Sequence, residues 1–124
     1  MNIPDVEILA WLLSGDLIVD LDNPTTIEIF GRTVKGYEIG GGRGRPEGSH
    51  TRFAFGLRHK GRRRTIVRGK LVYMAGARRV VPAGFEVAHR DDDRYNDAFE
   101  NLIMLTEEDH KKFDGKFSKD EVPF

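Results

Sequence analysis

The chain has 124 residues, 39% of them hydrophobic, with 20 basic and 20 acidic side chains and no cysteine. This length fits one domain with a modest core, and the lack of cysteine excludes disulfides and thiolate zinc sites. The longest apolar run, ILAWLL, is too short to span a bilayer, and the first residues lack the basic region of a signal peptide, so we expect a cytoplasmic protein that does not contact a membrane.

Charge is distributed unevenly along the sequence. Residues 1–40 carry two Lys/Arg against seven Asp/Glu, residues 41–80 carry twelve against one, and residues 81–124 carry six against twelve. The central third therefore has a net charge of +11 between two acidic ends. Such a concentration of positive charge is typical of proteins that bind polyphosphates, because neutralised phosphates release counterions. We expect a nucleic-acid partner; internal pairing with the acidic ends is the alternative.

The first third predicts a helix followed by strands. PDVEILAWLL has apolar residues at helical spacing and acidic residues in its first turn, which predicts a packing helix over residues 4–14. Alternating β-branched runs predict strands near residues 17–21, 26–30 and 33–39. GGGRGRPEGSH, residues 40–50, lacks the Gly-Lys-Ser/Thr ending of a P-loop, and we interpret it as a basic arm that touches a nucleic-acid backbone.

The central basic region predicts a β-hairpin over residues 51–68, with its turn at Lys60 and Gly61. Alternation places Phe53, Phe55 and Leu57 on one face and Arg52 and Arg58 on the other. We expect basic side chains here to contact phosphates without reading base sequence; the alternative is a charged strand face. The candidates are Arg58, Arg62, Arg63, Arg64, Arg68 and Lys70, together with Arg90 further along. KLVYMAG then predicts a short helix ended by Gly76.

The segment VAHRDDDRYNDAFENLIMLTEEDH, residues 87–110, predicts a strand, a loop, a strand and a helix. GFEV leads into His89, DDDRYND has turn composition, and NLIMLT suits an antiparallel strand. Thr106 is the expected helix N-cap, with Asp109 three residues later and His110 one turn into the helix. Only packing of that helix on the hairpin would bring His89 and His110 together.

This segment resembles the HNH endonucleases, whose active site is a ββα-metal unit. Their pattern reads approximately V-x-H-x-D-x-D-x-x-N-N-x-x-x-N-L-x-x-L-T-x-x-x-H. The corresponding positions are Val87, His89, Asp91, Asp93, Asn96, Asp97, Asn101, Leu102, Leu105, Thr106 and His110. VPAGFEV resembles the family's lead-in and GKLVYMA resembles its preceding short helix, so that the resemblance covers residues 60–113.

The resemblance implies a role for three side chains. His89 would be the general base that deprotonates water, and Asn101 would orient His89 or brace the loop. His110 would bind one divalent metal ion, Mg²⁺ or Mn²⁺, with Zn²⁺ or Ni²⁺ as alternatives. The expected function is metal-dependent hydrolysis of double-stranded DNA by a phage-encoded or bacterial protein. A monomer would nick one strand, and a homodimer would cut both.

The expected fold is α+β. An N-terminal region, residues 1–50, contains the helix and a small β region, and an HNH-type domain, residues 51–124, contains the ββα unit at 85–115.

One position departs from the family's pattern. Ala88 stands where the family usually has Asp or His as the other protein ligand of the metal. Three alternatives follow: a carboxylate among Asp91, Asp92 and Asp93 substitutes, water and phosphate complete the metal's coordination, or metal binding is lost and the chain only binds DNA. A protein-interaction domain for an acidic partner is a further class. Asp97 replaces the family's second loop Asn, a conservative change for a turn.

Overall fold

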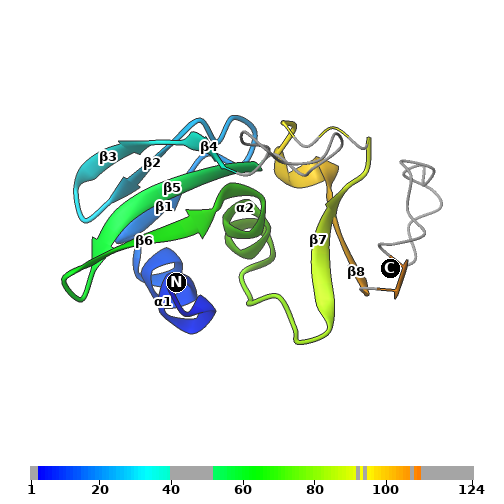
Figure 1. Ribbon diagram of the computed structural model, residues 1–124, viewed down its shortest axis with the longest axis horizontal. Helices are drawn as coiled ribbons and strands as arrows, with labels where there is room; N and C mark the ends of the chain where they lie inside the picture. Colours follow the sequence, from blue (N-terminus) through cyan, green and yellow to red (C-terminus); the bar gives the residue numbers. More distant parts are fainter. Residues whose placement is uncertain (1–2, 40–51, 92, 94, 107, 110–124) are drawn as a thin grey trace, which may run out of the picture.

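The computed structural model describes residues 3–39, 52–91, 93, 95–106 and 108–109. Within this part of the chain, two α-helices and three small antiparallel sheets give the α+β class that the sequence predicts. Figure 1 shows that α2 lies between strands β1 to β6 and the β7–β8 hairpin. The basic segment 40–50, Asp92 and His110 lie outside the described residues.

The N-terminal helix confirms the predicted one. α1, Asp5–Ser14, begins after Pro4 and ends at Gly15, whose φ of 86° is the left-handed conformation that glycine adopts without strain. Its inward face buries Ile8 and Leu12 against a three-stranded antiparallel sheet. That sheet consists of β1 Leu17–Val19, β2 Thr26–Ile29 and β3 Arg32–Lys35, in the order β1-β2-β3.

The single strand predicted over residues 33–39 is wrong, because two short strands in different sheets replace it. β3 ends at Lys35, and β4, Tyr37–Ile39, pairs with β5 in the second sheet. Gly36 lies between them, where a Cβ atom would be 3.2 Å from the Phe55 ring. The chain crosses between the sheets at this position because glycine allows this close approach. The second sheet is completed by β5 Arg52–His59 and β6 Arg62–Val67, in the order β4-β5-β6.

The second helix, α2, Arg68–Ala77, differs from the prediction at both ends. It starts at Arg68, which the sequence pattern assigns to the end of the returning strand. It ends with Arg78 in the left-handed conformation, so Gly76 is inside the helix and does not end it. Gly76 serves packing instead: a Cβ atom there would lie 2.2 Å from the ring of Phe99.

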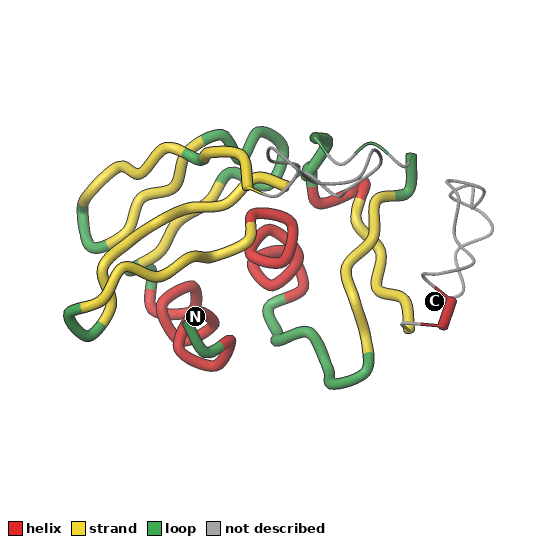
Figure 2. The backbone as a smooth tube through the Cα atoms, in the orientation of Figure 1, coloured by secondary structure: helices red, strands yellow, loops and turns green. Residues whose placement is uncertain are grey.

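The predicted strand–loop–strand unit is present. β7, Phe85–His89, pairs antiparallel with β8, Leu102–Thr106, and a 3-10 helix, η1, Phe99–Asn101, precedes β8. Figure 2 shows the two strands as a hairpin beside α2, with η1 at one end. The backbone N–H of Asp109 donates to the Thr106 hydroxyl at 3.1 Å, which confirms the predicted cap. The remainder of the predicted helix lies outside the described residues.

Two buried clusters hold these elements together. The larger one joins residues of α1, β1 and β2 to residues of β5, β6 and α2, so apolar burial spans both sides of residue 50. The second one packs Val72 and Tyr73 of α2 against Leu102 and Met104 of β8. α2 therefore belongs to both clusters and fixes the hairpin relative to the rest of the fold. The domain division at residue 50 stays a prediction. No helix in the described part is long and apolar enough to cross a membrane.

Candidate active site

His89 is the last residue of β7 and lies beside the first turn of α2. A Cβ atom at Gly69 would be 3.9 Å from its Nε2 atom. The His89 side chain is 20% exposed, and its Nε2 atom lies 2.6 Å from Oδ1 of Asp97. His89 is thus oriented by a side chain from the loop between β7 and β8. At the same time it keeps some access to solvent.

Asp97 is buried, with 3% of its side chain exposed, and it joins His89 to Arg68. Its Oδ2 atom accepts a hydrogen bond from Nε of Arg68 at 2.8 Å. A buried carboxylate requires compensation of its charge, and the Arg68 guanidinium supplies it. The result is a continuous chain of guanidinium, carboxylate and imidazole from α2 to β7.

Arg68 is itself held on several sides. Its Nη2 donates to the backbone carbonyl of Tyr95 at 3.1 Å, and its guanidinium carbon lies 4.0 Å from the ring centroid of Phe53. The rings of Phe53 and Tyr95 meet edge to face at 5.5 Å. A guanidinium that stacks on an aromatic ring and also bonds a carboxylate has little remaining freedom. The structure therefore places Arg68 in the interior of the site and not among the exposed candidates for phosphate contact.

Asn101 braces the loop. Its Nδ2 donates to Oδ1 of Asp91 at 2.9 Å and to the backbone carbonyl of Asn96 at 2.8 Å, while its Oδ1 accepts the Asp91 backbone N–H at 3.3 Å. Of the two roles expected for Asn101, these contacts fit loop bracing. Asp97 is the residue in contact with His89.

The Asp91 carboxylate is the acceptor at the centre of this network. Partial burial raises the pKa of Asp91, but side-chain hydrogen bonds from Asn96 and Asn101 and the backbone N–H of Asp93 together outweigh that effect. The pKa of Asp91 therefore lies below its ordinary value. The loop is organised around an ionised carboxylate.

The described residues do not complete a metal site. No group of three or more His, Asp or Glu side chains suited to a metal ion occurs among them. Ala88 is 1% exposed and packs with Ile103 and Leu105, so its position contributes only a methyl group. The Asp91 carboxylate is already engaged by the loop, and Oδ1 of Asp93 accepts the Tyr95 N–H. His110, the ligand that the resemblance implies, lies outside the described residues.

The seven basic candidates differ in exposure and in their partners. Arg58, Arg62 and Arg63 are exposed on the β5–β6 hairpin, whereas Arg64 and Arg90 are half-buried. Arg58 and Arg63 are directly opposite each other across the strands. Lys70 pairs with Asp5 of α1 at 2.8 Å, which places it against the N-terminal helix. Exposure therefore favours Arg58, Arg62 and Arg63 as phosphate contacts.

Sequence reasoning missed the importance of Asp97 and Gly69. A Cβ atom at position 69 would be 3.1 Å from Oδ1 of Asp97, so glycine gives the carboxylate room beside α2. One signal was present: an acidic residue stands where the resembled pattern has asparagine. Its partner Arg68 lies 29 residues earlier, and no local periodicity could connect the two.

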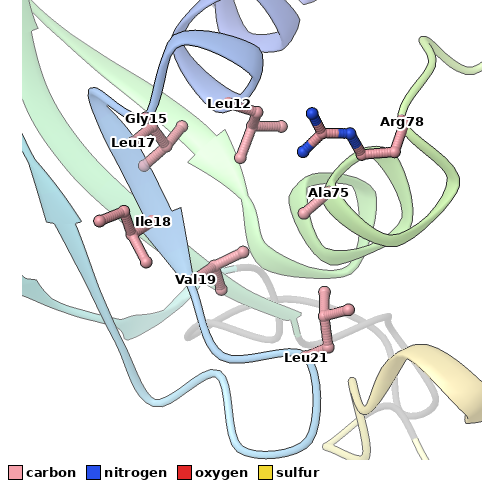
Figure 3. Close-up of a pocket in the computed structure, with 8 residues that line it drawn as sticks. All are labelled: Leu12, Gly15, Leu17, Ile18, Val19, Leu21, Ala75 and Arg78. Carbon is pink, nitrogen blue, oxygen red and sulfur yellow. The ribbon is translucent and has the colours of Figure 1, made fainter.

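An open pocket lies elsewhere on the molecule (Figure 3). It has a volume of about 190 Å³ and lies between the α1–β1 region and the C-terminal end of α2. Arg78 supplies its charged group, and none of the predicted site residues lines it. The pocket is therefore separate from the surroundings of His89.

Comparison with known proteins identifies the region that contains His89. Residues 79–112 match the family model described as HNH endonuclease. The matched residues include β7, η1 and β8, and with them His89, Asp97 and Asn101. No curated protein matches the chain, and no solved structure does.

Proposed function

Because residues 79–112 form an HNH endonuclease domain, we propose that this protein hydrolyses phosphodiester bonds of double-stranded DNA with His89 as the general base. The observation that carries the proposal is the contact between His89 and Asp97 within the matched segment, 2.6 Å long. Imidazole is suited to this role because its ordinary pKa is close to neutral pH. A partly exposed imidazole held by a buried carboxylate can receive a proton from water without rearrangement.

The proposed reaction is a hydrolysis. One water molecule gives a proton to His89 while its oxygen bonds to phosphorus, and the bond from phosphorus to the 3′ oxygen breaks. The products are a 5′-phosphate and a 3′-hydroxyl, whose proton comes from solvent. A divalent cation would stabilise the charge that develops on the phosphate. Among the described residues, no group of three or more His, Asp or Glu side chains could hold this cation.

The arginines of the β5–β6 hairpin support a DNA partner. Arg58 and Arg63 are exposed and directly opposed, an arrangement that is unfavourable between like charges. No carboxylate among the described residues forms an ion pair with either one. A phosphate backbone would neutralise both charges. The proposed duplex therefore lies along this hairpin and contacts the protein through its phosphates.

Incubation with supercoiled plasmid tests the proposal. The purified protein is mixed with plasmid in EDTA, Mg²⁺ or Mn²⁺, and binding to a labelled duplex is measured in parallel. Conversion to the nicked or linear form only in the presence of metal supports the endonuclease. Nicked product would fit a monomer, and linear product without a nicked intermediate would fit two cooperating copies.

The second candidate function is DNA binding without cleavage. The buried Ala88 methyl group favours it, because the family's pattern usually has a metal ligand at that position. Salt-sensitive duplex binding together with intact plasmid under every metal condition would support this module in place of the endonuclease. Intact plasmid without binding would remove both candidates.

A further inference from the structure

We propose that Asp97 and Arg68 are positioning residues that keep the proton of the His89 ring on Nε2 and leave Nδ1 to accept the proton from water. The inference rests on the proposed function of His89 as general base, and it deepens that function by naming the atom that acts. Neither Asp97 nor Arg68 touches the reacting atoms in this scheme. Both act through the imidazole.

The argument begins with the hydrogen-bonding capacity of each group. An ionised carboxylate only accepts hydrogen bonds, so the 2.6 Å contact between Nε2 of His89 and Oδ1 of Asp97 requires an N–H on Nε2. A neutral imidazole has one N–H, and its other nitrogen then carries a lone pair. No hydrogen bond from the described residues reaches Nδ1. The geometry therefore selects the tautomer with Nδ1 as the basic atom.

Arg68 holds the Asp97 carboxylate in the required orientation. It binds Oδ2 at 2.8 Å, so Oδ1 is the oxygen presented to His89. Arg68 is 7% exposed and is held in turn by the Tyr95 carbonyl and the Phe53 ring. Gly69 leaves room for Oδ1 beside α2, because a Cβ atom at that position would lie 3.1 Å from it.

The carboxylate has two consequences for the proposed proton transfer. Before the reaction it holds the ring in one tautomer and one orientation. When the proton of water moves to Nδ1 and the water oxygen bonds to phosphorus, the resulting imidazolium lies beside an anion that is already in place. In the Ser-His-Asp triad the carboxylate has the same two effects. Asparagine, the residue of the resembled pattern at position 97, has no negative charge and could also donate its own N–H to the ring.

Nitrogen NMR of the histidine ring tests this inference without requiring nuclease activity. In ¹⁵N-labelled wild-type protein, long-range ¹H–¹⁵N spectra identify which nitrogen of neutral His89 carries the proton. We expect Nε2 to be protonated and Nδ1 to be bare. In Asp97→Asn, we expect the Nδ1–H tautomer to become populated. Asp22→Asn, the same change at an exposed position, is the matched control and should leave the wild-type spectrum of the ring.

Nuclease kinetics provide the second readout. Asp97→Asn should lower kcat by about 10²- to 10⁴-fold, by analogy with loss of the orienting carboxylate in a triad. KM for DNA should change by less than about twofold, because Asp97 is buried and binds no DNA. Gly69→Ala is a second variant that retains both charges: its methyl group would displace Oδ1, and it should lower kcat in the same direction.

The outcomes separate the inference from the function on which it rests. A wild-type His89 protonated on Nδ1 overturns the inference even if plasmid is cleaved, and this result needs no variant to fold. The inference is also overturned if Asp97→Asn folds and has the same His89 tautomer and the same kcat as wild type. Protonation of Nε2 that depends on Asp97, in a protein that never cleaves DNA, would uphold the positioning geometry and remove the proposed nuclease function.

Discussion

Phe99 occupies the space that a side chain at position 76 would need. A Cβ atom built on Gly76 lies 2.2 Å from Cδ1 of the Phe99 ring. The 3-10 helix before β8 therefore packs directly on the backbone of α2. This contact sets the distance between two parts of the site, because α2 begins with Arg68 and the 3-10 helix ends with Asn101.

Gly76→Ala should destabilise the fold, because the methyl group must displace the Phe99 ring. We expect a loss of about 1–3 kcal/mol in the free energy of unfolding, the usual range for overpacking. Urea denaturation measures it. Gly56→Ala is the control: its methyl group would meet mainly the flexible end of Arg63, which can move away. Equal stability of wild type and Gly76→Ala would contradict the packing described for Phe99.

Asn101→Ala should loosen the loop between β7 and β8. It removes the two hydrogen bonds that Nδ2 donates and leaves the Asn96 carbonyl without this donor. We expect a loss of about 1–3 kcal/mol, together with faster amide exchange in Asp91, Asp93 and residues 95–97. Asn23→Ala, at an exposed position of another loop, should show neither effect. Wild-type exchange rates in the Asn101 variant would show that this side chain does not brace the loop.

Acid should weaken the same loop through Asp91. Its pKa in the folded protein lies below the ordinary aspartate value of about 3.9. Because the pKa is lower in the folded state, the ionised carboxylate stabilises the fold at pH values above the unfolded-state pKa. This stabilisation is lost as the pH falls through the folded-state pKa. Carboxyl ¹³C NMR should place the pKa of Asp91 below 3.9 and show that Asn101→Ala raises it. An ordinary pKa in wild type would contradict the hydrogen-bond network.

Arg58→Ala and Arg63→Ala should each weaken DNA binding through loss of a phosphate contact. The slope of log K against log salt should fall by about one for each substitution, without a change in preference among duplex sequences. Each substitution also removes one member of an opposed like-charge pair, so stability without DNA should be unchanged or slightly higher. Arg32→Ala, an equal loss of charge on β3, is the control. Salt slopes that match wild type would place the DNA elsewhere.

Elements with a strong local pattern could be predicted from the sequence. The helix that ends at Gly15, the β5–β6 hairpin, and the strands that contain His89 and Leu102 all follow from periodicity and turn residues. The Thr106 cap is equally local, because donor and acceptor are three residues apart. Resemblance to the HNH family suggested the role proposed for His89, and the family match confirms the resemblance over residues 79–112.

Features that depend on distant partners could not be predicted. From the local sequence, a glycine such as Gly36 or Gly76 indicates only a turn or the end of an element. In the structure, Gly36 allows close approach of Phe55, and Gly76 is covered by Phe99. In the sequence, Arg68 belongs to a run of basic residues and is predicted to contact phosphate. In the structure, it is the buried partner of Asp97. The contact of Asp97 with His89 could not be predicted for the same reason. Asp97 stands where the resembled pattern has asparagine, and in the sequence this change indicates only a turn.

The rate of plasmid nicking by His89→Ala tests the central claim most directly. Wild type and variant are compared with saturating DNA in Mg²⁺ or Mn²⁺, after circular dichroism and duplex binding establish that both fold and bind equally. If His89 is the general base, the variant should nick about 10²- to 10⁴-fold more slowly at unchanged DNA affinity. Equal nicking rates would contradict the account and assign proton transfer to another group.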